Sequence, residues 1–191
     1  MRTISLILLS AVLIPATAQA QSHPQTRNGF TISFGIGSGS ASFDCDGCNS
    51  DQETAGSGYL RIGGAVRPNL IIAGQINSWT KSRNDAALSI STLAAVAQWY
   101  PNVTGGFYVE GGIGAGTITT QYIFGGGTFS TSKSGLGFQA GAGYDWRVAR
   151  NFSLTPYVNY FSASTGSASY GSNSDKLNAK VFHFGLGFTW H

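Results

Sequence analysis

The two cysteines of the chain are its first candidates for chemistry, and they lie in the short motif CDGC as Cys45 and Cys48. A thioredoxin-type redox pair needs a helix start beside a βαβ unit, and the surrounding sequence predicts no helix. Half of a metal site would need further ligands, which only the neighbouring aspartates could supply. Because an exported chain meets an oxidising compartment, we expect a small disulfide that staples an exposed loop.

Histidine is the usual base that activates a nucleophile, and the chain has three histidines, His23, His183 and His191. His23 precedes the first predicted strand, and His191 is the last residue. His183 takes an inward position in its predicted strand. Since a nucleophile without a base is not activated, we predict no catalytic residue. We also predict no cofactor and no metal site.

A third group of candidates is charged, and each member takes a polar position in an otherwise apolar, alternating stretch. The group consists of Arg61, Glu110, Asp145 and Arg147. Counted from the predicted turns, Glu110 and Asp145 should lie close together on neighbouring strands. Two carboxylates alone in a narrow interior would repel each other, and one would take up a proton. Arg61 faces them and Arg147 adds a second cation, so we predict an internal ion-pair network of these residues.

The elements that must position these groups are eight stretches after Asn28, in which apolar residues alternate with polar residues or glycine. The clearest is the C-terminal FHFGLGFTWH, with apolar positions at Phe182, Phe184, Leu186, Phe188 and Trp190. The opposite face of each stretch is polar or lacks side chains. Such a face would not fill the core of a sandwich, so we infer that the apolar face points outward.

Connections of two kinds alternate between these stretches. Loops rich in Gly, Ser, Thr and Asn are expected at 41–56, 81–86, 119–132 and 164–178, and tight turns at 67–69, 101–105 and 149–151. Large aromatic residues gather near the tight turns, as in the interfacial girdle of membrane barrels: Phe30, Trp99, Phe107, Trp146, Phe152 and Trp190. We therefore predict an all-β fold over residues 28–191. It is an eight-stranded antiparallel up-and-down transmembrane barrel with long extracellular loops and short periplasmic turns.

The first twenty residues have the features of a cleaved signal peptide. Arg2 provides the positive start, ISLILLSAVLI the apolar region, and AQA at 18–20 the small residues of a cleavage site. We expect residues 1–20 to be removed, residues 21–27 to form a periplasmic tail, and the barrel to lie in the cell outer membrane. The formal net charge of +3 is too small to indicate nucleic-acid binding.

Over nearly all of residues 28–191, the chain resembles the small eight-stranded outer-membrane barrels of the OmpA/OmpX type. The most specific match is HFGLGFTW, which resembles the C-terminal signal read by the barrel-assembly machinery. His183, Gly185, Phe188 and Trp190 occupy its key positions, whereas family members usually stop before a residue such as His191. The resemblance implies outer-membrane lipid, lipopolysaccharide and the assembly machinery as partners, and we expect a monomer.

Two features at the long-loop end leave alternatives open. Lys180, Lys133 and Lys81 could contact lipopolysaccharide phosphates, or they could be solvated loop charges. Inward glycines at that end could line a ligand cavity, or they could ease strand curvature. These glycines are Gly35, Gly37, Gly39, Gly112, Gly114, Gly116, Gly135 and Gly137.

An eight-stranded barrel has a lumen wide enough for side chains but not for a channel. We therefore predict a structural or surface-interaction role, in envelope integrity or loop-mediated contact, and not an open channel. The alternative is a barrel that binds a small ligand or lipid in its glycine-lined upper lumen. A lipid A-modifying enzyme, a class that includes barrels of this size, is the least favoured, because no histidine can be placed at the outer end.

Overall fold

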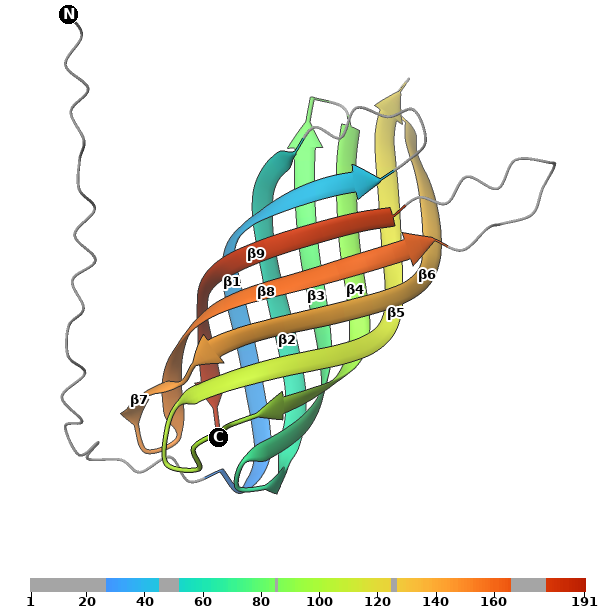
Figure 1. Cartoon of the computed structure of the whole chain (residues 1–191). Helices are drawn as coiled ribbons and strands as arrows, with labels where there is room; N and C mark the ends of the chain where they lie inside the picture. The colour runs from blue at the N-terminus through green and yellow to red at the C-terminus, as the bar shows by residue number, and fades with distance from the viewer. Residues whose placement is uncertain (1–26, 45–51, 85, 125–126, 166–177) are drawn as a thin grey trace, which may run out of the picture.

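The computed structural model describes residues 27–44, 52–84, 86–124, 127–165 and 178–191. These residues form β-strands joined by turns, in the order shown in Figure 1. The strands are β1 (Gly29–Asp44), β2 (Glu53–Arg67), β3 (Leu70–Arg83), β4 (Ala86–Trp99), β5 (Phe107–Phe124), β6 (Gly127–Tyr144), β7 (Trp146–Ala149), β8 (Phe152–Thr165) and β9 (Asn178–Trp190). Within the described ranges, no helix is long and apolar enough to cross a membrane.

The sheet closes on itself as an antiparallel barrel. Each strand pairs with its neighbours in the chain, and β1 pairs with β9 to close the ring. The nine segments make eight strands, because β6 and β7 are one strand interrupted at Asp145, and both pair with β8. Figure 1 shows the strands tilted around the barrel, with the C-terminus at the end that carries the short turns. The predicted eight-stranded up-and-down barrel is confirmed.

The outward and inward faces follow the predicted alternation. Large apolar residues such as Phe30, Leu136 and Trp190 are exposed on the outer wall, whereas Gln139 and Asn159 are buried in the lumen. Aromatic rings cluster at the short-turn end. There Phe188 packs against Phe34 and Phe152, with ring centroids 5.4 and 5.6 Å apart. This arrangement is the interfacial girdle expected of a membrane barrel.

The strands continue well beyond the length needed to cross a bilayer. Apart from β7, they are 13 to 18 residues long, whereas a spanning strand needs about 9–11. The predicted loop at 119–132 is therefore wrong for most of its length, because Thr119 pairs with Ser132 and the ladder runs on to Phe124. Most of the predicted loop at 81–86 is also strand, since Arg83 pairs with Ala86. Figure 1 shows the β5–β6 hairpin rising at the loop end.

The sequence predicts loops there because apolar alternation stops and residues such as serine and threonine, which are common in loops, follow. Outside the membrane, the outer wall no longer needs apolar side chains. The ladder persists there because cross-strand hydroxyls bond each other, as Thr119 and Ser132 do at 2.9 Å. The predicted disulfide of Cys45 and Cys48 lies outside the described residues.

One close approach between strands requires glycine. Gly37 on β1 and Gly185 on β9 are register partners. A Cβ on Gly185 would lie 2.8 Å from the Gly37 Cα and would also meet the Ile36 carbonyl oxygen. Because these neighbours are backbone atoms, which shift only at a high energetic cost, a side chain at either position would force β1 and β9 apart.

Candidate functional site

The inward side chains include a polar layer and an apolar layer, and a further buried apolar cluster packs near the short turns: Ile71, Ala73, Ala94, Val96, Tyr100 and Tyr108. The polar layer lies toward the short-turn end and is built around Ser33, Tyr59, Arg61, Gln75, Asn77, Glu110, Gln139, Asn159 and Thr189. The apolar layer lies toward the loops and consists of Ala41, Trp79, Ile90, Ile118, Phe161, Ala163, Ala179 and Val181.

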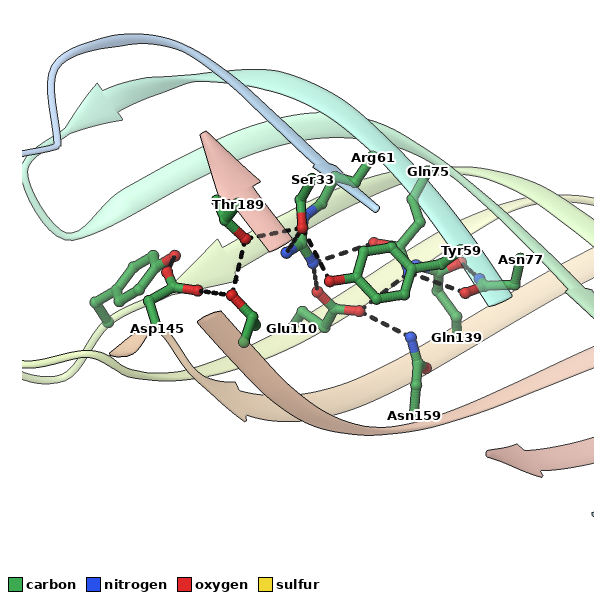
Figure 2. Close-up of polar contacts among 12 residues, drawn as sticks. Ser33, Tyr59, Arg61, Gln75, Asn77, Glu110, Gln139, Asp145, Asn159 and Thr189 are labelled. Atoms are coloured by element: carbon green, nitrogen blue, oxygen red, sulfur yellow. Dashed lines mark hydrogen bonds and ion pairs between the residues drawn. The ribbon is translucent and has the colours of Figure 1, made fainter. Parts of the chain in front are cut away.

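An ion pair between Arg61 of β2 and Glu110 of β5 forms the centre of the polar layer (Figure 2). Both side chains are only 3% exposed. Arg61 Nη1 donates to Glu110 Oε2 and, at 3.2 Å, to the side-chain oxygen of Gln75. The guanidinium also lies over the rings of Tyr59 and Tyr108, at 5.2 and 5.4 Å from their centroids. Sequence reasoning named both charges, and the structure brings them together.

Amide side chains complete the surroundings of Glu110. Its Oε1 accepts hydrogen bonds from Gln75 at 3.2 Å and from Asn159 at 2.9 Å. Gln75 also donates to Asn77, which in turn donates to Gln139 at 2.6 Å. These residues come from four strands, so the buried carboxylate is held by hydrogen bonds around the barrel. Such compensation is what a buried ion pair requires to offset its desolvation.

Asp145 is not beside Glu110, contrary to the prediction. The Asp145 backbone amide bonds the carbonyl of Gly106, whereas Glu110 lies four residues further along the chain. That spacing corresponds to roughly 13 Å along a strand. The error arose from counting residues up from each predicted turn. The strand that contains Asp145 continues as β7 toward the periplasmic end, so Asp145 lies in a lower position.

A relay of hydroxyl groups connects the two acids instead. Thr155 donates to Asp145 Oδ1 at 2.8 Å and lies 2.9 Å from the hydroxyl of Thr189. Thr189 contacts Ser33 at 2.9 Å, and Ser33 accepts from Arg61 at 3.4 Å. Figure 2 shows this path from Asp145 to Arg61. The sequence places these hydroxyls on inward faces by parity, but it assigned them no part in the predicted network.

A basal group of residues closes the periplasmic end below Asp145. Tyr100 donates to Asp145 Oδ2 at 2.7 Å, and Arg27 stacks 3.4 Å over the Tyr100 ring. Arg27, the last residue of the predicted periplasmic tail, is 2% exposed and donates to the carbonyls of Val103 and Gly105. Arg147 also faces inward and donates to the Arg150 carbonyl at 2.9 Å. Burial, and then Asp145, raise the pKa of Tyr100 well above its usual value.

His191, the residue that departs from the usual terminal signal, belongs to this basal group. Its backbone amide donates to the Asn151 carbonyl. Its ring Nε2 lies 3.1 Å from the Ser153 hydroxyl and 4.0 Å from the Asp145 carboxylate. Burial lowers the pKa of His191 to about 4, although Asp145 acts in the opposite direction. The extra residue therefore packs into the floor of the barrel as a neutral imidazole. The other positions of the predicted assembly signal lie on β9, and their role stays a prediction.

The apolar layer occupies the upper lumen that the sequence described as lined by glycine. Trp79 is fully buried, and its indole nitrogen donates to the Gly39 carbonyl at 2.8 Å. A Cβ on Gly39 would come within 2.9 Å of the Trp79 ring, so this glycine makes room for the indole. Phe161 is fully buried as well. Gly39 therefore faces an aromatic side chain rather than an open cavity.

His183 lies between the two layers. Its Nδ1 is 3.2 Å from the Ser57 hydroxyl, and its ring packs edge-on against Tyr157 and Phe161 with centroids 5.3 Å from each. Its Nε2 has no hydrogen-bond partner among the described residues. A serine beside a histidine is the pair that acyl-transfer enzymes use. Here the imidazole is fully buried inside the lumen, away from the lipid on the outer wall.

The three predicted lysines do not share one surface. Lys81 has inward parity and forms an ion pair with Glu53 at the mouth of the barrel. Lys133 also has inward parity, because it is the register partner of the buried Ile118. Lys180 alone of the three projects from the outer wall. Contact of these lysines with lipopolysaccharide phosphates stays a prediction.

An open apolar groove of about 530 Å³ lies over β5, β6, β8 and β9. Phe107, Tyr144, Pro156 and Phe184 are among its lining residues. All four have outward parity, so the groove faces lipid rather than the lumen.

Comparisons with known proteins agree with this architecture. The model of the outer membrane protein beta-barrel domain family matches residues 5–189. The structure of Ail, the attachment invasion locus protein of Yersinia pestis, is similar with a TM-score of 0.61 and 18% identity, covering 85% of this chain and 99% of that one. Neisserial surface protein A is similar with a TM-score of 0.56 and 16% identity, covering 85% and 96%. No curated protein sequence matches the chain.

The family match covers more than half of the chain, and the two structures share its fold. The outward apolar wall and the aromatic girdle agree with that fold. The chain belongs to the outer membrane protein beta-barrel family, and it is an eight-stranded barrel of the outer membrane.

Proposed function

We propose that this protein is a closed barrel with a structural or surface-interaction role in the outer membrane, and not an open channel. The observation that supports the proposal is the filling of the lumen by two different layers in series. A solute would have to pass both the Arg61–Glu110 ion pair and the buried rings of Trp79 and Phe161. An eight-stranded barrel is narrow even before these side chains are counted.

The test is conductance in planar bilayers. We compare the parent with a polar-layer variant, Arg61→Ala/Glu110→Ala, an apolar-layer variant, Trp79→Ala/Phe161→Ala, and the variant that combines all four changes. Because the layers are in series, each single-layer variant should stay closed, and only the combined variant should conduct. Steady conductance by the parent would overturn the proposal. Heat-modifiable migration on gels checks that each variant is folded.

The structural part of the role is tested in cells. A strain without the protein should become more sensitive to bile salts and hydrophobic antibiotics, and the parent chain should restore resistance. The combined variant should restore it less well if closure matters to the envelope. Unchanged sensitivity of the deletion strain would contradict a role in envelope integrity and leave surface contact as the remaining candidate.

We infer that surface contact through the β5–β6 hairpin is the second candidate. The hairpin extends above the barrel and carries exposed apolar side chains at Tyr122, Ile123 and Phe129. Exposed apolar groups in one place often mark an interaction site. Among the similar structures, Ail is an attachment invasion locus protein that has also been solved with the heparin analogue sucrose octasulfate.

Binding of whole cells that display the protein to host-cell surfaces and to immobilised heparin tests this candidate. Replacing Tyr122, Ile123 and Phe129 by serine should reduce cell binding several-fold. Val103→Ser is a matched control, because Val103 is similarly exposed but lies at the periplasmic end. Equal binding by both variants would exclude the hairpin as the contact. If the hairpin variant lost binding to heparin but still bound host cells, the partner of the hairpin would be a glycan.

A further inference from the structure

The outer wall above the apolar belt carries a band of hydroxyl side chains that the proposed function does not use. All members have outward parity and come from seven of the eight strands. The hydroxyl band consists of Ser38, Ser40, Ser42, Thr54, Ser78, Thr80, Ser82, Ser89, Ser91, Thr117, Thr119, Ser130, Ser132, Ser134, Ser162 and Ser164.

The change from belt to band is abrupt and occurs on strand after strand. On β1 the exposed Ile36 is followed outward by Ser38, and on β6 the exposed Leu136 is followed by Ser134. On β8, Tyr160 is followed by Ser162. At the other end, the belt finishes in the aromatic girdle. The band therefore begins where hydrocarbon ends and the outer headgroups begin.

Cross-strand neighbours make the band continuous over parts of the wall. One arc runs from Ser78 through Ser91 and Thr117 to Ser134 on β3 to β6. On β1, β9 and β8, Lys180 lies between Ser42 and Ser162 and interrupts the hydroxyls with one cation. The band is thus a two-dimensional array of hydroxyl groups rather than scattered polar residues.

The hydroxyls of the band also bond one another. Thr80 pairs with Ser89 at 3.0 Å, Thr117 with Ser134 at 3.0 Å, and Thr119 with Ser132 at 2.9 Å. A hydroxyl has one donor and two acceptor sites, so each pair keeps free capacity after its mutual bond. The pairing also fixes side-chain rotamers, which lowers the entropy cost of binding a further hydroxyl group.

The chemistry of this array fits sugars better than phosphates. Phosphate sites in proteins are typically formed by Arg and Lys, which supply charge-assisted hydrogen bonds. Within the described part of the band, Lys180 is the one cationic residue on the outward face. A neutral array of donors and acceptors matches the hydroxyl groups of a glycan, which are also both donors and acceptors.

We propose that the hydroxyl band binds the sugar headgroups of neutral glycolipids in the outer leaflet. The inference rests on the barrel lying in the outer membrane with its loop end outward, as the proposed function also requires. Each glycolipid would place its acyl chains against the apolar belt and its sugar against the band. The band would then select a sugar-rich surrounding leaflet over a phosphate-rich one.

The experiment measures thermal stability in vesicles of three compositions. Purified full-length protein is reconstituted in phosphatidylcholine alone, with added diglucosyl diacylglycerol, or with added phosphatidylglycerol. Unfolding is followed by heat-modifiable migration, and retained glycolipid by native mass spectrometry. We expect the glycolipid to raise the unfolding midpoint by about 5 °C, as for a ligand well above its dissociation constant. Phosphatidylglycerol should raise it much less.

Two variants of one hairpin assign the effect to the band. Thr117→Val/Thr119→Val/Ser132→Ala/Ser134→Ala removes four outward hydroxyls, and should lose at least half of the glycolipid-dependent rise. Thr120→Val/Thr131→Val removes a register pair from the opposite face of the same hairpin and should keep the rise. If the four-site variant does not fold, Thr117→Val/Ser134→Ala replaces it.

Three results would overturn the inference. No rise with glycolipid would mean that the band faces only water. An equal or larger rise with phosphatidylglycerol, abolished by Lys180→Gln, would show that an anionic headgroup is the ligand. Equal losses in the band variant and its control would remove the assignment to the outward face. If the parent barrel stays closed in bilayers but shows no preference for glycolipid, this inference is wrong and the proposed function still stands.

Discussion

The polar layer and the apolar layer fill the same tube, but they differ in what holds each residue in place. In the polar layer, Arg61 and Glu110 depend on each other, and their partners come from several strands. In the apolar layer, Trp79 and Phe161 depend on close packing, apart from the single bond of the indole to Gly39. Removing one polar partner leaves a buried charge, whereas trimming one apolar residue leaves a small void. Near-isosteric substitutions should therefore separate the two layers.

The largest effect should follow Glu110→Gln, which changes little in volume but leaves the Arg61 guanidinium buried without its carboxylate. We expect a loss of about 3–5 kcal/mol in the free energy of unfolding. Urea unfolding in lipid vesicles measures it. The double variant Arg61→Met/Glu110→Gln is the control, because it removes both charges and should recover much of the loss. A Glu110→Gln barrel as stable as the parent would mean that the ion pair is not important for folding.

Arginine substitutions on the outer wall test the height of the apolar belt that surrounds the two layers. Leu186 lies midway along the outward face of β9, so Leu186→Arg should cost about 2–4 kcal/mol at the bilayer midplane. Leu136 borders the hydroxyl band, so Leu136→Arg should cost only about 0–1 kcal/mol, the value for an interface. The same urea assay compares them. Equal costs at the two positions would place the belt at a different height.

A smaller effect is expected for Phe161→Leu in the apolar layer. The replacement keeps the position apolar and nearly filled, so the loss should stay below about 1.5 kcal/mol. Phe161→Asn, which puts an amide among apolar neighbours, should cost more. If Phe161→Leu were as damaging as Glu110→Gln, the contrast between the layers would not hold.

The smallest effect concerns the pH dependence contributed by His191. Its pKa is about 4 in the folded protein and near 6.5 when unfolded. The unfolded chain therefore binds a proton first, and stability that is complete above pH 6.5 is lost as the pH falls toward 4. We expect a loss of about 1 kcal/mol, less than a shift of this size gives in a rigid site, because the end of the chain can fray and solvate the imidazole as it takes up its proton. His191→Gln should remove this part of the pH dependence; an unchanged profile would show that His191 does not contribute.

The sequence by itself determined the fold class, the strand count and which face meets lipid. These follow from a period of two, which indicates strands, and from the need to satisfy every backbone group within a membrane, which strands can do only in a closed sheet. Parity also placed Arg61 and Glu110 in the lumen, because both occupy polar positions of alternating strands, and those positions face inward. The aromatic girdle followed from the position of large rings beside the tight turns.

The tertiary structure alone decided the heights of residues across strands. Strand tilt and stagger are collective properties of the closed barrel, so counting from a turn could not show that Asp145 lies below Glu110 and bonds Tyr100 and Thr155. The same stagger brings Trp79 and Phe161 into the glycine-lined part of the lumen and His191 into the floor. Sequence parity gives the direction of a side chain, whereas its neighbours depend on register, which is set by all the strands together.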